Sequence, residues 1–292
     1  MVISQILGGL GNQMFQYAAG RALSLALGCP LLLDLRGFKR YSLHNGFEID
    51  RVFYAPVEAA TEAEVSQVLG WRAGKLIRKL LKRVPSPLLC GPHLAIEPSF
   101  NYWPELRQVD KPSYLMGYWQ SEKYFKDFEQ NIRSDFSFKT SLDGENLATS
   151  VSMQGCNSVS LHVRRGDYVT HAPTAKILNV CSIDYYQKAI TRIAEQVPSP
   201  HFFVFSDDQQ WVRNNLKIPF PTEHIDRNHG MKSYIDMQLM SFCKHQIIAN
   251  SSFSWWGAWL NVNPDKIVIA PRNWFCNGMD DSDLIPQQWT RL

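Results

Sequence analysis

The chain has 292 residues, of which 45% are hydrophobic, and its formal net charge is +3. This length can bury one large core or two of ordinary size, and we expect two domains. The small net charge provides no concentrated basic face of the kind that nucleic-acid binding needs, so no nucleic-acid partner is expected. The six cysteines are widely spaced without a CxxC pair, which disfavours a zinc centre and fits a reducing compartment.

The location of the protein is predicted from its apolar segments. The first residues, MVISQILGGLGNQ, lack a basic n-region, and no run reaches the roughly 18 apolar residues of a spanning helix, so we expect a cytoplasmic protein. Residues 71–84, WRAGKLIRKLLKRV, combine six basic residues and no acid with apolar residues at helical spacing. Two interpretations stay open: peripheral contact with the inner membrane, or a solvated helix packed on its own domain.

The first half of the chain begins with the pattern of a parallel α/β sheet. Residues 2–7 predict a strand, GGLGN a tight turn, 13–27 a helix and 31–34 a second strand. Such a turn places backbone amides at a helix N-terminus. The pattern then becomes less regular, with helical stretches near 61–82 and 121–131 and a strand at 114–117.

The second half predicts a doubly wound domain. Strand patterns alternate with helix patterns, the strands at 158–163, 201–205, 245–249 and 266–270 and the helices at 183–197, 207–216, 232–243 and 252–261. The polar segment 139–150 suits a linker, or a linker followed by a helix. We therefore place the domain boundary near residue 150, give or take ten, which gives domains at 1–150 and 151–292.

Four polar clusters follow predicted strands: GGLGNQ, HVRRGD, SDD and NSSFSWW. Ligands of doubly wound sheets bind outside the carboxyl ends of the strands, so facing domains would bring all four clusters to one cleft. In GGLGNQ, Gly9 and Gly11 let the backbone approach a ligand, and Asn12 and Gln13 offer amide donors. A capped turn with Asn12 as N-cap explains the same residues, and Met14 at the third glycine position excludes a dinucleotide fingerprint.

The cluster HVRRGD holds two adjacent arginines with different predicted directions. His162 and Arg164 share one face of the strand and Arg165 lies on the other. The fork of donors on a guanidinium matches phosphate oxygens, and Asp167 can cap the turn or accept from a base or sugar. A structural Arg165–Asp167 pair is the alternative. An RGD adhesion signal would require export, for which the chain shows no signal.

Acidic and hydroxyl residues form the other two clusters. Ser206, Asp207 and Asp208 can hold a metal, a ribose or a base, or can cap the next helix, which is the default interpretation. Asp281 and Asp283 have DxD spacing in a loop and are interpreted as solvated surface.

The cluster NSSFSWW carries the densest polar signal. Serines at a helix start present hydroxyls and amides to an anion, and Phe253 can stack on a base or sugar. These candidates are Asn250, Ser251, Ser252, Phe253 and Ser254. Most of the three tryptophans that follow are expected to pack in the core.

Taken together, GGLGNQMFQYA, HVRRGDY, VFSDD and NSSFSWWGAWL resemble the bacterial alpha-1,2-fucosyltransferases of glycosyltransferase family 11. The resemblance extends over the chain and includes FEIDRVF at 47–53 and GYWQSEKYF at 117–125. It implies an α/β, GT-B-like fold in which two Rossmann-like domains enclose the donor GDP-fucose. It also implies that no metal or other cofactor is required.

The implied reaction is an inverting transfer of fucose from GDP-β-L-fucose to the 2-hydroxyl of a galactose-type residue. Arg164, with Asn12 and the glycine-turn amides, would stabilise the departing diphosphate. His162, Asp167, the SDD residues and the NSSFS residues would hold guanine, ribose and phosphate. The base is not determined among His44, Glu48 and Glu122.

Two partners follow from this reading, GDP-fucose and a galactoside acceptor glycan. Acceptors range from lactose-type ends to lipid-linked O-antigen units. The alternative function is a catalytically silent nucleotide-sugar-binding protein.

Overall fold

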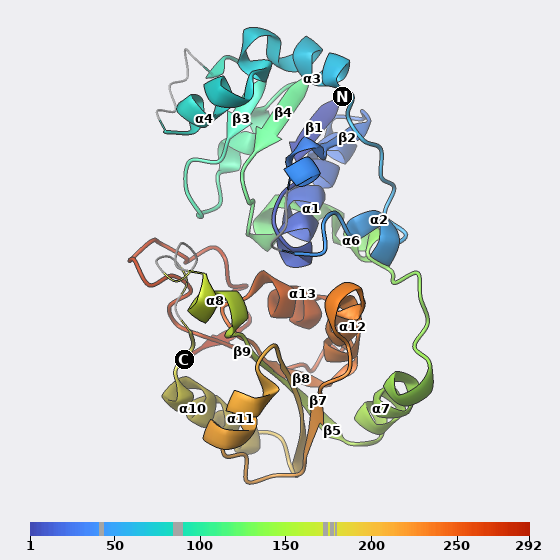
Figure 1. Cartoon of the computed structure of the whole chain (residues 1–292), viewed down its shortest axis with the longest axis vertical. Coiled ribbons are helices and arrows are strands. Elements are labelled where there is room, and N and C mark those ends of the chain that lie inside the picture. Colours follow the sequence, from blue (N-terminus) through green and yellow to red (C-terminus); the bar gives the residue numbers. More distant parts are fainter. Residues whose placement is uncertain (41–43, 84–89, 172–174, 176–177, 179) are drawn as a thin grey trace. The chain divides into compact units, whose positions relative to one another are not determined.

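A computed structural model describes residues 1–40, 44–83, 90–171, 175, 178 and 180–292 (Figure 1). The chain forms two compact α/β units. The first comprises Met1–Lys139 and Ser282–Leu284, and the second comprises Thr140–Asp281 and Ile285–Leu292. The units therefore divide at the start of the segment 139–150, and the helix α7 (Gly144–Gly155) within that segment belongs to the second unit.

The first unit contains a parallel four-stranded sheet in the order β2-β1-β4-β3. The strands are β1 (Val2–Gln5), β2 (Leu31–Asp34), β3 (Leu94–Ile96) and β4 (Ser113–Met116). The α-helices are α1 (Leu10–Ala26), α2 (Ile49–Val52), α3 (Glu62–Leu69), α4 (Lys75–Arg83) and α6 (Glu129–Asp135). Short 3-10 turns are η1 (Arg36–Arg40), η2 (Gly70–Ala73), η3 (Pro104–Gln108), η4 (Glu122–Tyr124) and η5 (Lys126–Phe128).

Alternation along β1 divides the packing of the first sheet between its two faces. Ile3 joins an apolar cluster with residues of α3 and α4. Ser4 points to the other face, where its hydroxyl donates to the carbonyl of Gln16 on α1 at 2.9 Å. A Cβ at Gly20 would lie only 2.9 Å from the Cβ of Ser4, so this glycine lets α1 lie close against the strand.

The second unit contains a six-stranded sheet in the order β10-β9-β8-β5-β6-β7, and all its strand pairs are parallel. The strands are β5 (Asn157–Val163), β6 (Pro200–Ser206), β7 (Thr222–Ile225), β8 (His245–Ile247), β9 (Val268–Ala270) and β10 (Thr290–Arg291). Besides α7 the helices are α8 (Gly166–Thr170), α10 (Ile183–Ala194), α11 (Gln209–Asn215), η6 (Gly230–Lys232), α12 (Tyr234–Phe242) and α13 (Ser252–Leu260).

Helices cover both faces of the second sheet, as its apolar strands require. On β6, Phe202 and Val204 pack with α10 residues in one cluster, whereas Phe203 and Phe205 pack with α7 and α12 residues in another. The doubly wound pattern predicted from the second half of the chain is thereby confirmed. The short strands β3, β7 and β10 were not predicted.

Within the described ranges, no helix has both the length and the apolar content needed to cross a bilayer.

Candidate functional site

The second unit brings three of the four polar clusters to one edge of its sheet. Strand β5 pairs with β6 on one side and with β8 on the other, so HVRRGD, SDD and NSSFSWW all follow the carboxyl ends of neighbouring strands. The rings of His162 and Phe253 are 6.1 Å apart, which places the first turn of α13 beside the end of β5. This edge is the location at which α/β sheets bind ligands, and we call it the β5 edge.

Arg164 is oriented by Asp207 at the β5 edge. The guanidinium Nη1 lies 3.0 Å from Oδ2 of Asp207, and the backbone N–H of Arg165 donates to Oδ1 of the same carboxylate at 2.9 Å. A Cβ at Gly166 would lie 2.5 Å from Oδ2 of Asp207, so only glycine leaves room for the carboxylate. The Arg164 side chain is 27% exposed, which leaves the charge accessible at the surface of the unit.

Tyr168 is a neighbour of Arg164 that the sequence reasoning did not select. The Arg164 guanidinium carbon is 5.7 Å from the centre of the Tyr168 ring, within range of a cation–π contact. The Tyr168 hydroxyl donates to the carbonyl of Asn250 at 2.8 Å. The aromatic residue directly after RGD was the available signal, and its role is to connect α8 with the loop before α13.

Arg165 has different partners, as strand alternation predicted. Its Nε is 3.1 Å from Oδ2 of Asp208, and its guanidinium carbon lies 3.9 Å from the centre of the Trp211 ring. Asp208 also caps α11 by accepting from the Trp211 amide at 3.1 Å, and its own amide donates to the Ser206 hydroxyl at 3.0 Å. Asp208 therefore has the capping role, with its amide bonded to Ser206, while Asp207 is the aspartate that contacts Arg164.

His162 is buried in its neutral form behind Arg164. Only 6% of the residue is exposed, and its Nδ1 has no hydrogen-bond partner among the described residues. Burial lowers the pKa of His162 to about 4, a shift that Asp207 opposes and Arg164 reinforces. The ring therefore carries no charge near neutral pH and can offer one hydrogen bond to a ligand.

The buried His162 is expected to make folding stability dependent on pH. An unfolded histidine takes up a proton near pH 6.5, whereas the folded protein binds it only near pH 4. Because the unfolded state then binds more protons, stability falls as the pH drops through this interval, by at most about 1.4 kcal/mol per pH unit from this group. Urea unfolding of the natural protein and of His162→Gln at several pH values measures the slope. Identical slopes of stability against pH in the two proteins would contradict the lowered pKa of His162 in the folded state.

The cluster NSSFSWW divides into residues whose polar atoms bond within the unit and residues that remain ligand candidates. Asn250 is buried: its Nδ2 donates to the Trp274 carbonyl at 3.0 Å, and its Oδ1 accepts from the Cys181 thiol at 3.3 Å. Ser254 is buried with its hydroxyl near the Ser251 carbonyl, at 3.3 Å. The polar side-chain atoms of Asn250 and Ser254 bond within the unit, which gives both residues a structural role, and their binding roles stay predictions.

Two serines and Phe253 remain as ligand candidates on α13. Ser251 is the N-cap of the helix and makes no side-chain cap hydrogen bond, and Ser252 is the first helical residue. Both lie at a helix start, where amides and the helix dipole favour an anion. The prediction that most of the tryptophans pack in the core is confirmed, since Trp255 and Trp256 are fully buried.

The DxD aspartates are not solvated surface, which corrects that interpretation. Asp281 accepts from the Trp274 amide and pairs with Arg291, and 14% of its side chain is exposed. Asp283 belongs to the first unit, where it pairs with Lys123 and accepts from the Tyr102 amide at 3.0 Å. No group of three or more His, Cys, Asp or Glu side chains in the described ranges is arranged to hold a metal ion. The side chain of Asp167 lies outside the described residues.

The glycine turn of the first unit leads directly into α1. The helix begins at Leu10 with Gly9 as N-cap, so Asn12 lies in the first turn and is not the cap. The Asn12 Oδ1 accepts from Nε2 of Gln120 at 2.8 Å. At Gly8, φ is +85° and a Cβ would lie 2.8 Å from Asn12 Nδ2, so the turn requires glycine there. Gly11, like Gly9, contributes backbone to this helix start.

Gln13 fixes the loop that carries two of the base candidates, His44 and Glu48. The side chain is fully buried. Its Nε2 donates to the carbonyls of Gly8 and Gly46 at 2.9 and 2.8 Å, and its Oε1 accepts from the Glu48 amide at 2.9 Å. Gln13 therefore has a structural role in the first unit, and its predicted role as an amide donor to a ligand stays a prediction. The sequence pattern did not indicate these bonds, because Gly46 and Glu48 lie more than thirty positions from Gln13.

The three base candidates have different surroundings. A Cβ at Gly9 would lie 3.2 Å from the His44 ring, so His44 lies directly on the glycine turn. Glu48 is 2% exposed, and its Oε1 is 2.7 Å from Nη2 of Arg51. Burial raises the pKa of Glu48, and Arg51 and Asn45 oppose the shift. Glu122 begins the short turn η4 and is half-buried.

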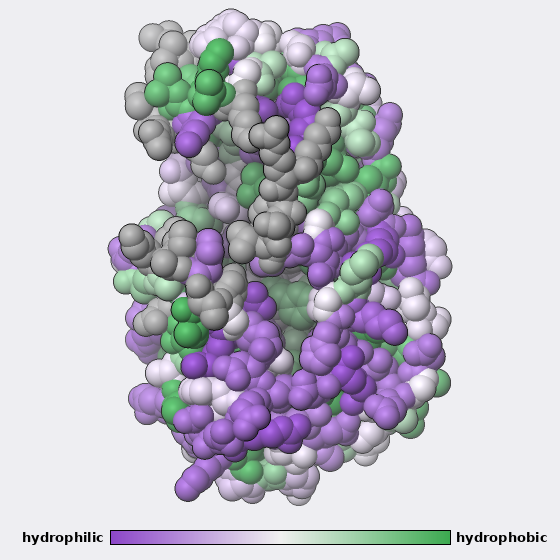
Figure 2. Space-filling model, in the orientation of Figure 1, coloured by the Kyte–Doolittle hydropathy of each residue, from purple (hydrophilic) through white to green (hydrophobic). Residues whose placement is uncertain are grey.

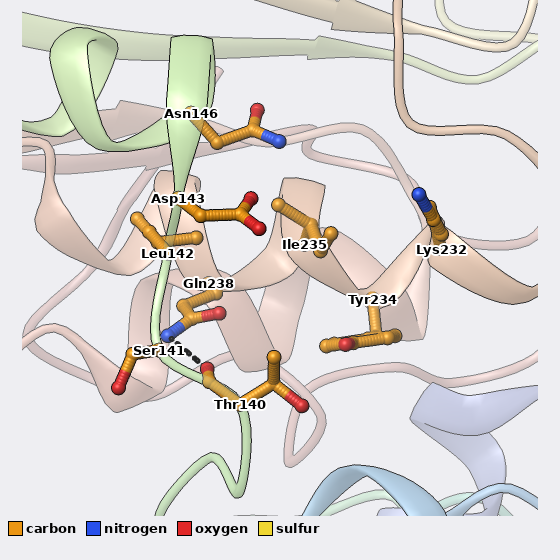
Figure 3. A pocket seen from close by; sticks show the side chains of 9 residues that line it. All are labelled: Thr140, Ser141, Leu142, Asp143, Asn146, Lys232, Tyr234, Ile235 and Gln238. Atoms are coloured by element: carbon orange, nitrogen blue, oxygen red, sulfur yellow. Dashed lines mark hydrogen bonds between the residues drawn. The ribbon is translucent and has the colours of Figure 1, made fainter.

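A pocket in the second unit lies apart from the predicted site residues. Segment 140–146 and the start of α12 form its walls, and Gln238 Nε2 donates to the Thr140 carbonyl at 3.4 Å (Figure 3). It shares no lining residue with the four motifs.

Comparison with known proteins identifies the family. The model of the family described as glycosyl transferase family 11 matches residues 106–291, which include the β5 edge. This chain belongs to glycosyl transferase family 11. Among its relatives, the alpha-1,2-colitosyltransferase of Escherichia coli is 36% identical, with all of this chain and 99% of the relative covered. The E. coli O-antigen biosynthesis glycosyltransferase WbnK is 33% identical, with 98% of each chain covered.

More distant relatives include vertebrate enzymes. The galactoside alpha-(1,2)-fucosyltransferase 2 of Gorilla gorilla gorilla is 24% identical over 90% of this chain and 70% of its own length. The crystal structure of fucosyltransferase NodZ from Bradyrhizobium aligns with a TM-score of 0.50 at 16% identity, covering 88% of this chain and 90% of NodZ. The GT-B-like fold with two α/β units, implied by the sequence resemblance, is thereby confirmed. The family 11 chain is a glycosyltransferase.

Proposed function

We propose that this family 11 protein transfers L-fucose from GDP-β-L-fucose to the 2-hydroxyl of a galactose-type residue, with inversion to an alpha-1,2 linkage. The observation that carries the proposal is Arg164, held by Asp207 at the end of β5 with the first turn of α13 beside it. A guanidinium and a helix start together match the charge and shape of a diphosphate. The alpha-1,2 linkage in the names of the colitosyl and fucosyl relatives supports the same product geometry.

The reaction is one in-line displacement at the anomeric carbon. The bond from this carbon to the acceptor oxygen forms while the bond to the diphosphate oxygen breaks, and GDP leaves with the bonding electrons. Arg164 offsets the charge that grows on the diphosphate, with Asn12 as the candidate donor from the glycine turn. The acceptor hydroxyl gives its proton to a base. Among the three candidates we favour His44, because it lies on the glycine turn and the Glu48 carboxylate is buried against Arg51.

The donor sugar has one competing candidate. Colitose is the 3-deoxy counterpart of L-fucose, and the 36% identical relative is named as a colitosyltransferase. A site that holds the GDP moiety through the β5 edge would accept either donor, and contacts to the sugar 3-hydroxyl would decide between them. The name of WbnK supports an O-antigen unit as the acceptor glycan.

Turnover of purified protein with GDP-fucose or GDP-colitose and a panel of galactosides tests this function. We expect GDP release and an alpha-1,2-fucosylated product, whose linkage NMR establishes. Transfer from GDP-colitose alone would overturn the donor assignment. Donor binding without transfer to any galactoside would instead support a catalytically silent nucleotide-sugar-binding protein.

The same assay tests whether a metal is required. We propose that the arginine replaces a divalent cation at the diphosphate, so the rate is expected to be unchanged in EDTA. Loss of activity that manganese restores would overturn this part of the proposal.

A further inference from the structure

Helix α4 exposes apolar side chains on its outer side. Leu76 is 82% exposed and Leu80, one turn further along, is 63% exposed. Trp71, in the preceding turn η2, is 57% exposed. Figure 2 shows a hydrophobic area where Figure 1 places α4. We call Trp71, Leu76 and Leu80, together with the neighbouring Lys79, the α4 surface.

The fold holds this surface outward. Leu81 is 3% exposed and packs, with Ile77, in the apolar cluster between α3 and the sheet. Arg78 is also buried, and its Nη1 donates to Asp34 at 3.2 Å and to the Tyr114 hydroxyl. A rotation of α4 that buried Leu76 and Leu80 would remove Arg78 from its carboxylate partner. The exposure of the two leucines is therefore imposed by packing on the opposite side of the helix.

The charge of this segment selects the kind of partner. Residues 71–84 contain six basic residues and no acid, and Arg78 pairs with Asp34. Lys79 is exposed and has no ion pair with any residue that the structure describes. The guanidinium carbon of Arg72 lies 4.7 Å from the centre of the Trp71 ring, so a positive charge also lies next to this aromatic side chain. The surface of an anionic bilayer has an apolar layer below negatively charged headgroups. It therefore matches exposed leucines and a tryptophan that lie among cations.

We propose that the α4 surface docks this protein on an anionic phospholipid membrane. The leucines enter the boundary between headgroups and acyl chains, Trp71 lies at the interface, and Lys79 contacts the headgroups. A protein partner would have to offer an acidic rim around an apolar groove, whereas an anionic bilayer supplies both features over any area. This inference does not depend on the sugar that the enzyme transfers.

Cosedimentation of the full-length protein with vesicles tests the proposal. We expect binding to phosphatidylcholine vesicles that contain phosphatidylglycerol and little binding to phosphatidylcholine alone. Replacing both leucines (Leu76→Glu and Leu80→Glu) is expected to lower the partition coefficient by about tenfold or more, because apolar burial is lost. Lys79→Ala is expected to lower it by about fivefold.

Matched controls separate this surface from general effects. Val262, in the second unit, is 80% exposed and Lys126 is also exposed, so Val262→Glu and Lys126→Ala remove similar groups elsewhere. Both controls should bind vesicles as the natural protein does, and circular dichroism should be unchanged in all variants. Absence of binding to anionic vesicles, or equal losses in the controls, would overturn the proposal. A shift from dimer to monomer caused by the leucine replacements would also overturn it, in favour of a self-association surface.

Discussion

Arg164→Ala is expected to lower kcat/KM for sugar transfer by about a hundredfold or more while the protein stays folded. The guanidinium would stabilise the charge that develops on the leaving diphosphate. Electrostatic stabilisation of this kind is usually among the largest contributions to lowering the activation free energy. The Arg164 guanidinium pairs with Asp207, between side chains that are 27% and 25% exposed. A partly exposed pair of this kind contributes about 1 kcal/mol or less, so the free energy of unfolding of the variant, measured in urea, should lie within about 1 kcal/mol of the natural value.

Arg165→Ala is the matched control, because it removes the adjacent guanidinium. That group lies on the Trp211 ring and pairs with Asp208, away from the contact between Arg164 and Asp207. We expect a loss of stability of about 1 kcal/mol and nearly unchanged kcat/KM in the folded protein. Steady-state kinetics of both variants test whether the two arginines contribute differently to kcat/KM. Near-natural activity in Arg164→Ala would refute the role given to this arginine, whatever Arg165→Ala does.

Asp34→Ala is expected to destabilise the protein by about 3–5 kcal/mol, because it leaves buried positive charge without a partner. The carboxylate accepts from Arg36 Nε at 2.8 Å, from the Tyr114 hydroxyl at 2.6 Å and from Arg78 Nη1 at 3.2 Å. Burial alone would raise the pKa of Asp34, but the hydrogen bonds from Arg36 and Tyr114 outweigh it and hold the pKa well below its usual range.

Urea unfolding measures this loss, and the exposed Asp50 supplies a control through Asp50→Ala. The sign of the pH effect follows from the depressed pKa of Asp34. Its contribution is fully present above the unfolded pKa near 4 and is lost as the pH falls toward the folded value. The variant should therefore show a weaker decline of stability in acid. A loss of stability no greater than that caused by Asp50→Ala would contradict the importance of the hydrogen bonds that Asp34 accepts.

The accuracy of the sequence-based predictions differed with the range of the interactions involved. Strand β2 was predicted at its observed bounds, and the predicted second-half strands all overlap observed ones. These elements are set by local apolar patterns. Gln13 and Asn250 were assigned to ligand binding because amides near strand ends suit that role. Both are instead bonded to residues distant in sequence, a relation that no spacing reveals.

The sequence alone determined the family resemblance, the parallel α/β architecture and the positions of four polar clusters after strands. These follow from motif letters and local periodicity, which are properties of short segments. Only the tertiary structure decided which polar atoms are already bonded within the fold and which remain accessible. It also assigned Asp207 to Arg164, neutralised Arg78 through Asp34 and thereby turned Leu76 and Leu80 outward. Packing on one side of a helix fixes what the other side exposes, and that constraint arises from contacts between distant segments.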